Sequence, residues 1–191
     1  MEELRMRGNG FALISVLLLI SLALIGFAYA HWEEIITVEG QVSTGKVDAE
    51  ITSWSCDDPP GTTDPDYDKD VASCECSIDE NDPQKAHVTI TNAYPCYTVN
   101  LYLTVKNTGT IPIALGEVRV DGNIIPDQEW TPIDLDGDGY DIEFYVIPGG
   151  SADPNGYITT TLMIHIMEDA KPSTTYTFTI ELDFWNWNEV Q

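Results

Sequence analysis

Positively charged residues are scarce in this sequence. Only 8 of the 191 residues are Lys or Arg, against 32 Asp or Glu, and the formal net charge at neutral pH is −24. This composition argues against nucleic acid and against an anionic lipid surface as partners, because both need clustered cations. A hydrophobic content of 43% argues equally against a disordered acidic tail. Salt-adapted solubility, cation binding, or both remain as explanations of the charge.

Recognisable catalytic motifs are absent as well. The sequence has no HExxH motif, no GxSxG nucleophile motif and no glycine-rich phosphate loop. Histidine occurs only three times, as His31, His87 and His165. His87 and His165 fall on the polar faces of strand patterns, so we expect surface side chains rather than catalytic bases. We therefore expect a protein that is not an enzyme.

The N-terminal residues 1–30 have the layout of a secretory signal peptide. Arg5 and Arg7 precede an apolar run over 11–30, which ends in the small-x-small pattern of 28–30. Cleavage after Ala30 is predicted, which leaves an extracellular domain, 31–191, with no membrane segment. A retained membrane anchor is one alternative, because about twenty apolar residues can span a bilayer.

A second alternative for this segment is a type IV pilin leader. The sequence Gly10-Phe11-Ala12-Leu13-Ile14 is similar to the processing site of that family, but Ser15 stands where the family usually has Glu. This reading would also make the chain a filament subunit.

Cysteine is rare, but its count is even. The four cysteines are Cys56, Cys74, Cys76 and Cys96. In an exported chain this number predicts two disulfides. Because Cys74 and Cys76 are too close in an extended strand to pair, Cys56–Cys74 with Cys76–Cys96 and Cys56–Cys76 with Cys74–Cys96 both remain open. A zinc site is a weaker alternative, since a second CxxC-type pair and a nearby histidine are missing.

Alternating hydrophobicity dominates residues 31–191. Three segments, 98–106, 157–167 and 175–184, place apolar side chains at every second position, and shorter runs occur near Val88 and Ile142. Turn signals rich in Gly, Asn, Asp and Pro separate them. The sequence predicts an all-β fold, a single antiparallel β-sandwich of the jelly-roll-like or immunoglobulin-like kind. The acidic, Cys-containing segment 56–82 interrupts this pattern and is expected to be a solvated surface insert.

The segment 134–143, with the sequence DLDGDGYDIE, predicts a calcium site. Asp134, Asp136 and Asp138 occupy loop positions one, three and five, and a glycine follows at position six. Position twelve, usually a bidentate Glu, is Tyr145, so the loop departs from the EF-hand pattern. Tyr140 would supply a backbone carbonyl, and Asp141 or Glu143 would complete the shell. A hairpin turn without metal is the alternative.

A second acidic run places carboxylates at alternate positions. They are Asp64, Asp66, Asp68 and Asp70. Such a run can wrap a cation, but Lys69 and the lack of a glycine make a solvated acidic loop an equal alternative.

Residues 31–42 read as an amphipathic strand at the start of the exported chain. One face carries apolar side chains, which are Trp32, Ile36, Val38 and Val42. Glycines at 40 and 45 follow. Such a strand can complete the sheet of a neighbouring copy or pair within its own sandwich, since both use the same hydrogen bonds.

Three sequence blocks then suggest a family. They are Trp32…Gly40…Thr44-Gly45-Lys46-Val47, then Asn92-Ala93-Tyr94-Pro95-Cys96-Tyr97 running into Asn107-Thr108-Gly109-Thr110-Ile111-Pro112, and Phe184-Trp185-Asn186-Trp187-Asn188. Over most of 31–191 the chain resembles the TasA/camelysin-like exported proteins, especially their archaeal relatives that form bundling pili and cannulae.

The resemblance implies a jelly-roll-like subunit that polymerises with itself, head to tail, by donor-strand complementation. It would form extracellular fibres of a biofilm matrix, a pilus or a cannula, with 31–42 as the donor strand. Some relatives are labelled metallopeptidases, but no zinc-ligand motif supports that activity here. The resemblance assigns no role to the segment 56–82.

The net charge predicts a condition for such polymerisation. Identical subunits of charge −24 repel one another unless salt or bound cations screen them. Assembly is therefore expected to depend on calcium or on salt.

Overall fold

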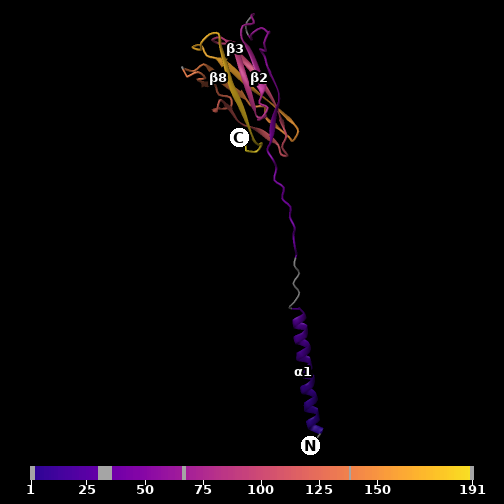
Figure 1. The fold of residues 1–191 in the computed structure, drawn as a ribbon. Coiled ribbons are helices and arrows are strands. Elements are labelled where there is room, and N and C mark those ends of the chain that lie inside the picture. Colours follow the sequence, from indigo (N-terminus) through magenta and orange to yellow (C-terminus); the bar gives the residue numbers. More distant parts are fainter. Residues whose placement is uncertain (1–2, 30–35, 66–67, 138, 190–191) are drawn as a thin grey trace. The chain divides into compact units, whose positions relative to one another are not determined.

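The computed structural model describes residues 3–29, 36–65, 68–137 and 139–189. The backbone falls into two units, Met1–Ser43 and Thr44–Gln191 (Figure 1). The first unit contains the helix α1, Glu3–Tyr29. Its stretch Gly10–Phe27 has a mean hydropathy of 2.6, enough to cross a membrane by length and composition, and a signal sequence at the N-terminus has the same character.

The second unit consists of eleven strands within the described residues. They are β1 Ala49–Cys56, β2 Ser73–Ile78, β3 Lys85–Ala93, β4 Thr98–Asn107, β5 Ile113–Val120, β6 Asn123–Ile125, β7 Thr131–Ile133, β8 Ile142–Ile147, β9 Ser151–Ala152, β10 Tyr157–Ile166 and β11 Thr174–Asn186. One antiparallel sheet has the order β1-β4-β10-β8-β7, and the other has the order β2-β3-β11-β5-β6, with β9 beside β5. The all-β, two-sheet prediction is confirmed, and the arrangement fits a sandwich.

The core between the sheets follows the alternation in the sequence. In β11 every second side chain is buried, and these are Tyr176, Phe178, Ile180, Leu182 and Phe184. In β4 the same phase buries Val99, Leu101, Leu103 and Val105. Because β4 and β11 lie inside different sheets, their apolar faces meet in one hydrophobic cluster. Phe144 of β8 and Phe178 of β11 contact each other there, with ring centroids 5.1 Å apart.

The turn after β4 shows why Asn107 and Gly109 stand where they do. Asn107 is wholly buried, and its amide group donates to the carbonyls of Ile111 and Ala152, while its side-chain oxygen accepts the Gly109 N–H. A Cβ at Gly109 would lie 2.3 Å from the Lys46 carbonyl oxygen. The turn therefore tolerates no side chain at 109, and it attaches residues 46–48 to the sandwich.

The acidic segment 56–82 differs from the expected solvated insert. Its second half forms β2, which pairs with β3 over Ser73–Ile78 and makes one edge of its sheet. The inward positions of β2 are the buried Cys74 and Cys76. These two cysteines are the only buried side chains of β2, and the surrounding sequence is acidic. The apolar–polar alternation of this strand was therefore too weak to predict it from the sequence.

Candidate functional site

Three carboxylates converge in the loop between β7 and β8. Asp134, Asp136 and Asp141 each place one oxygen atom within 4.8 Å of the others. Calcium–oxygen distances are about 2.3–2.6 Å, so ligands on opposite sides of one ion are up to about 5 Å apart. The spacing of these three oxygen atoms is therefore compatible with part of a calcium shell, and Asp134 and Asp136 belong to the DxDxDG pattern.

Hydrogen bonds hold this loop in place. Asp141 is buried, and its carboxylate accepts the Leu135 N–H at 3.2 Å and the Tyr176 hydroxyl at 3.1 Å. Burial and the neighbouring Asp141 raise the pKa of Tyr176 to about 12. Asp134 accepts the Gly137 N–H at 2.6 Å. The loop is thus built on Asp141, which fixes it to the core strand β11.

One of the expected ligands of this loop, Glu143, lies elsewhere. The carboxylate of Glu143 is 2.9 Å from Nδ1 of His165 on the outer face of the first sheet, so Glu143 does not close the shell. Tyr140 is exposed, and Asp138 lies outside the described residues. The ammonium group of Lys171 is 2.8 Å from Asp136 and partly balances the cluster's charge, which no sequence pattern indicated.

The second acidic run is built differently from a cation loop. Asp64 is buried, and its carboxylate accepts the N–H groups of Val71 and Ala72 at 2.7 and 3.1 Å. It therefore closes the loop 64–72. Asp68 and Asp70 are exposed, and Asp66 lies outside the described residues. In the part of the chain that the structure describes, these carboxylates form no cluster of three.

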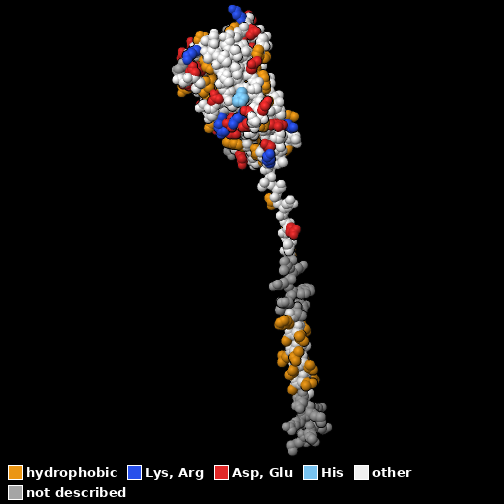
Figure 2. Space-filling model, viewed as in Figure 1, with side chains coloured by type: hydrophobic (Ala, Val, Ile, Leu, Met, Phe, Trp, Pro, Cys, Tyr) orange, Lys and Arg blue, Asp and Glu red, His pale blue; other side chains and the backbone are white. Residues whose placement is uncertain are grey.

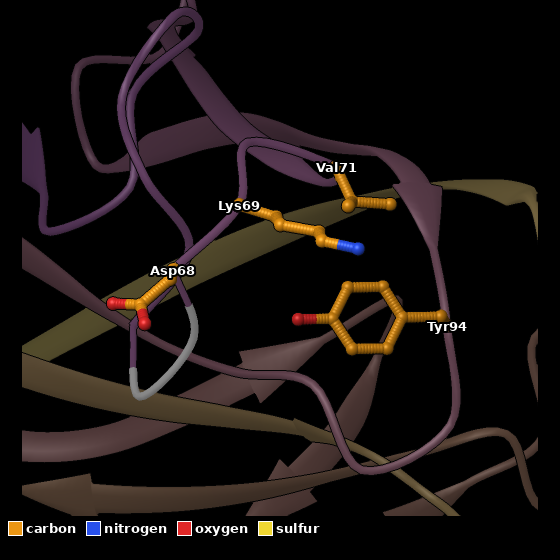
Figure 3. A pocket seen from close by; sticks show the side chains of 4 residues that line it. All are labelled: Asp68, Lys69, Val71 and Tyr94. Carbon is orange, nitrogen blue, oxygen red and sulfur yellow. The ribbon is translucent and has the colours of Figure 1, made fainter.

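A pocket of about 320 Å³ adjoins this loop. Figure 3 shows Lys69 extending across the space between Val71 and the ring of Tyr94, while the carboxylate of Asp68 points away from that ring. The lining is mostly apolar, which does not suit a metal ion.

Asp58 is a buried acid within an otherwise acidic, unpatterned run of the sequence. Its carboxylate accepts the Tyr97 hydroxyl at 2.6 Å and the Thr62 hydroxyl at 3.0 Å, and both Asp58 and Tyr97 are wholly buried. Burial raises the pKa of Asp58, although the two hydroxyls oppose that shift. The sequence Pro59-Pro60-Gly61, directly after Asp58, predicts a turn there, and an Asp before a turn often accepts hydrogen bonds from it.

The four cysteines are free thiols in this structure, and neither expected set of two disulfides is formed. Cys56 ends β1, and its thiol donates to the carbonyl oxygen of Cys74 at 2.8 Å. Cys76 is buried in β2, whereas Cys96 is exposed in the loop between β3 and β4. The expected zinc alternative finds no ligand set in the described residues.

The expected donor strand forms neither helix nor strand over 36–42. Its apolar side chains are open to solvent, with exposed fractions of 78% for Ile36, 84% for Val38 and 90% for Val42. Trp32 lies outside the described residues.

Two edge strands border the sandwich on the same side, where β1 and β2 contact each other across the two sheets. The start of β1 is covered, because Ile51 N–H donates to the Pro83 carbonyl at 2.7 Å. In β2, the Asp79 N–H bonds to Lys85 of β3, so by alternation the backbone groups of Cys76 and Ile78 face away from the sheet. A pocket of about 310 Å³ lies there, lined by Trp54 of β1 and residues of β2 and β3.

Charge is distributed unevenly over the domain. The strands contain only six acidic and three basic residues, a net charge of −3 out of the −24. Most of the excess acid therefore lies outside the sheets. Figure 2 shows a broad uncharged area on the visible face of the domain, with acidic side chains around it.

A search with protein-family models finds none that matches this chain, and no curated protein matches its sequence.

Proposed function

We propose that this protein is an exported structural subunit that polymerises head to tail. Residues 31–42 of one copy add as a strand to the sandwich of the next, whose fold we assign to the jelly-roll-like kind. The product is an extracellular fibre of the pilus, cannula or biofilm-matrix type, and the protein has no catalytic role.

The observation that carries this proposal is the unpaired N-terminal segment. Ile36, Val38 and Val42 are apolar, lie in one strand phase and are almost fully exposed. Exposing such a segment is unfavourable, by about 25 cal/mol for each Å² of apolar surface. A second copy can bury it without any change of the sandwich, and a contact of this kind does not close on itself.

The edge of β2 is the acceptor that we favour. The backbone groups of Cys76 and Ile78 face away from β3, and unpaired edges of this kind accept a further strand. Trp54 lines the adjoining pocket and offers an apolar contact for one side chain of the incoming strand. Main-chain bonds would supply affinity, and this pocket would supply register.

Deletion of 31–42 from the exported chain tests the proposal. We expect the variant to remain folded by circular dichroism but to form no fibres in electron micrographs, because the donor strand is lost. Val38→Asp is expected to have the same effect, since it puts a charge on the apolar face. Thr37→Asp adds the same charge to the opposite face and is the matched control. Unchanged fibres from the deletion variant would refute donor-strand exchange.

A second candidate function is a monomeric calcium-binding module of the cell surface. The convergence of Asp134, Asp136 and Asp141 favours it. In that case 31–42 would pair within its own domain, and the protein would sediment as a monomer both with and without calcium. Calcium at this loop is compatible with either function, since in a filament it would stabilise the subunit and lower its charge.

A further inference from the structure

The cysteines offer an inference that does not depend on polymerisation. Cys56 at the end of β1 and Cys74 near the start of β2 lie side by side, although β1 and β2 belong to different sheets. The Cys56 thiol donates to the Cys74 carbonyl oxygen at 2.8 Å. The Cys74 N–H in turn donates to the Asp58 carbonyl at 2.8 Å, which fixes the two segments together.

We infer that Cys56 and Cys74 form a disulfide in the exported protein, and that Cys76 and Cys96 remain thiols. This selects one bond from the two sets that the sequence allowed, and it replaces two disulfides with one. Cys76 is buried on β2, and Cys96 is exposed on another loop.

The two thiols suit the two steps of thiol–disulfide exchange. Cys56 is partly exposed, and the side chain of Cys74 beside it lowers the pKa of its thiol, so it is the thiol that attacks an incoming disulfide. The hydrogen bond with Cys56 and burial raise the pKa of Cys74, which fits the resolving thiol.

The oxidant is a disulfide, either of small molecules or of an exported oxidoreductase. The Cys56 thiolate bonds to one sulfur of that disulfide and expels the other as a thiol. Cys74 then gives up its proton, attacks Cys56 Sγ and expels the second oxidant thiol. Two protein thiols are oxidised by two electrons, and one oxidant disulfide is reduced to two thiols.

The bond would join the edge strands β1 and β2, at the end of β1 and near the start of β2. It would close a loop that contains the acidic segment 57–73, and with it the buried acids Asp58 and Asp64. For a loop of this length, loss of the bond is expected to lower Tm by roughly 10 °C in a domain of this size.

Thiol counting on the purified exported protein tests the inference. After denaturation without reductant we expect two reactive thiols per chain, and a peptide map that joins Cys56 to Cys74. Four thiols, with or without an equimolar zinc ion, would overturn it, and so would a mapped bond to Cys76 or Cys96.

Variants separate the bond from the packing of the side chains. Cys56→Ser and Cys74→Ala are each expected to leave three thiols and to lower Tm, whereas the control Cys96→Ser leaves one thiol and an unchanged Tm. Reductant should lower the Tm of the unsubstituted protein towards that of Cys56→Ser and should leave Cys56→Ser itself unaffected. An equal response of both proteins to reductant would contradict the disulfide, and this comparison holds even if Cys74→Ala does not fold.

Discussion

Among the described residues, three acidic side chains are almost fully buried, whereas most of the other acids face solvent. Asp58, Asp64 and Asp141 each accept two hydrogen bonds, which come from their own loop or from a segment packed against it. Burying a carboxylate is costly unless hydrogen bonds compensate it. These residues therefore fix loop conformations, a role that is distinct from the solubility that the net charge provides.

Asp58 should make stability depend on pH in a particular direction. Burial raises its pKa above the unfolded value, so protonation favours the folded state and this contribution is lost as pH rises through the folded pKa. Asp58→Asn keeps an acceptor for Tyr97 and removes the titration. We expect the variant to be more stable than the unsubstituted protein at pH 7, by roughly 1 kcal/mol, with a difference that shrinks on acidification towards pH 4.

Urea unfolding between pH 4 and pH 8 measures this difference. Asp68→Asn removes the same charge at an exposed position of the same segment, and its difference from the unsubstituted protein should stay small throughout. Parallel pH profiles for the unsubstituted protein and Asp58→Asn would show that Asp58 does not titrate in this range.

Among the elements, the connection between β7 and β8 is where we propose that calcium binds. It holds a buried carboxylate, Asp141, beside two exposed ones, and Lys171 as a counter-charge. A divalent cation has to compete with that ammonium group for Asp136. The affinity of the loop for a divalent cation is therefore expected to be moderate. It should fall when the charge of the three carboxylates or their spacing is changed.

Calcium should raise Tm, and the Asp136→Asn variant should lose most of that response, because one of three converging carboxylates is neutralised. Differential scanning calorimetry with calcium and with chelator measures the shift. The matched control is Glu129→Gln, an exposed acid outside the cluster, which should respond as the unsubstituted protein does. An identical calcium response in all three proteins would show that the loop is only a turn.

At the scale of the whole molecule, the separation of charge from the sheets matters most. The strands carry a net charge of −3 and the rest of the chain carries −21. Two copies that approach each other through strand edges or sheet faces would therefore keep their most acidic segments out of the contact. The negatively charged loops would still repel one another at a distance. Physiological salt screens this repulsion between loops that are farther apart than the Debye length, which is about 8 Å under those conditions.

Assembly is accordingly expected to increase with salt. Sedimentation of the polymer between about 0.02 and 1 M sodium chloride measures it, since the Debye length shortens from tens of ångströms to about 3 Å in that range. Millimolar calcium should act at a lower ionic strength than sodium chloride, and Asp136→Asn should remove only this calcium effect. Assembly that weakens with salt would mean that attractive charge pairs hold the subunits together.

The long strands were predictable because one side of each faces a core. The segments 98–106, 157–167 and 175–184 became β4, β10 and β11 within one or two residues at each end. The predicted surface positions of His87 and His165 are consistent with their partial or full exposure. A period of two residues is a local property, so local sequence is sufficient to reveal it.

The edge strands and the buried acids were not predictable in the same way. β2 has cysteines as its only apolar inward residues before Ile78, and β1 changes phase at an irregularity between Ile51 and Ser53. Asp58 looks like any other acid in an acidic run, and its burial depends on Tyr97, which is 39 residues away. Such positions are set by partners that the local pattern does not contain.

The sequence by itself determined the all-β class, the apolar N-terminal helix, the main strands and the acid-rich loop at 134–141. These follow from side-chain period, hydropathy and residue type. Only the tertiary structure decided that Asp141 rather than Glu143 joins Asp134 and Asp136, that 36–42 forms neither helix nor strand, and that Cys56 lies beside Cys74. Each of these depends on which distant segments pack together, because contact in space is decided by the pairing of strands and not by distance along the chain.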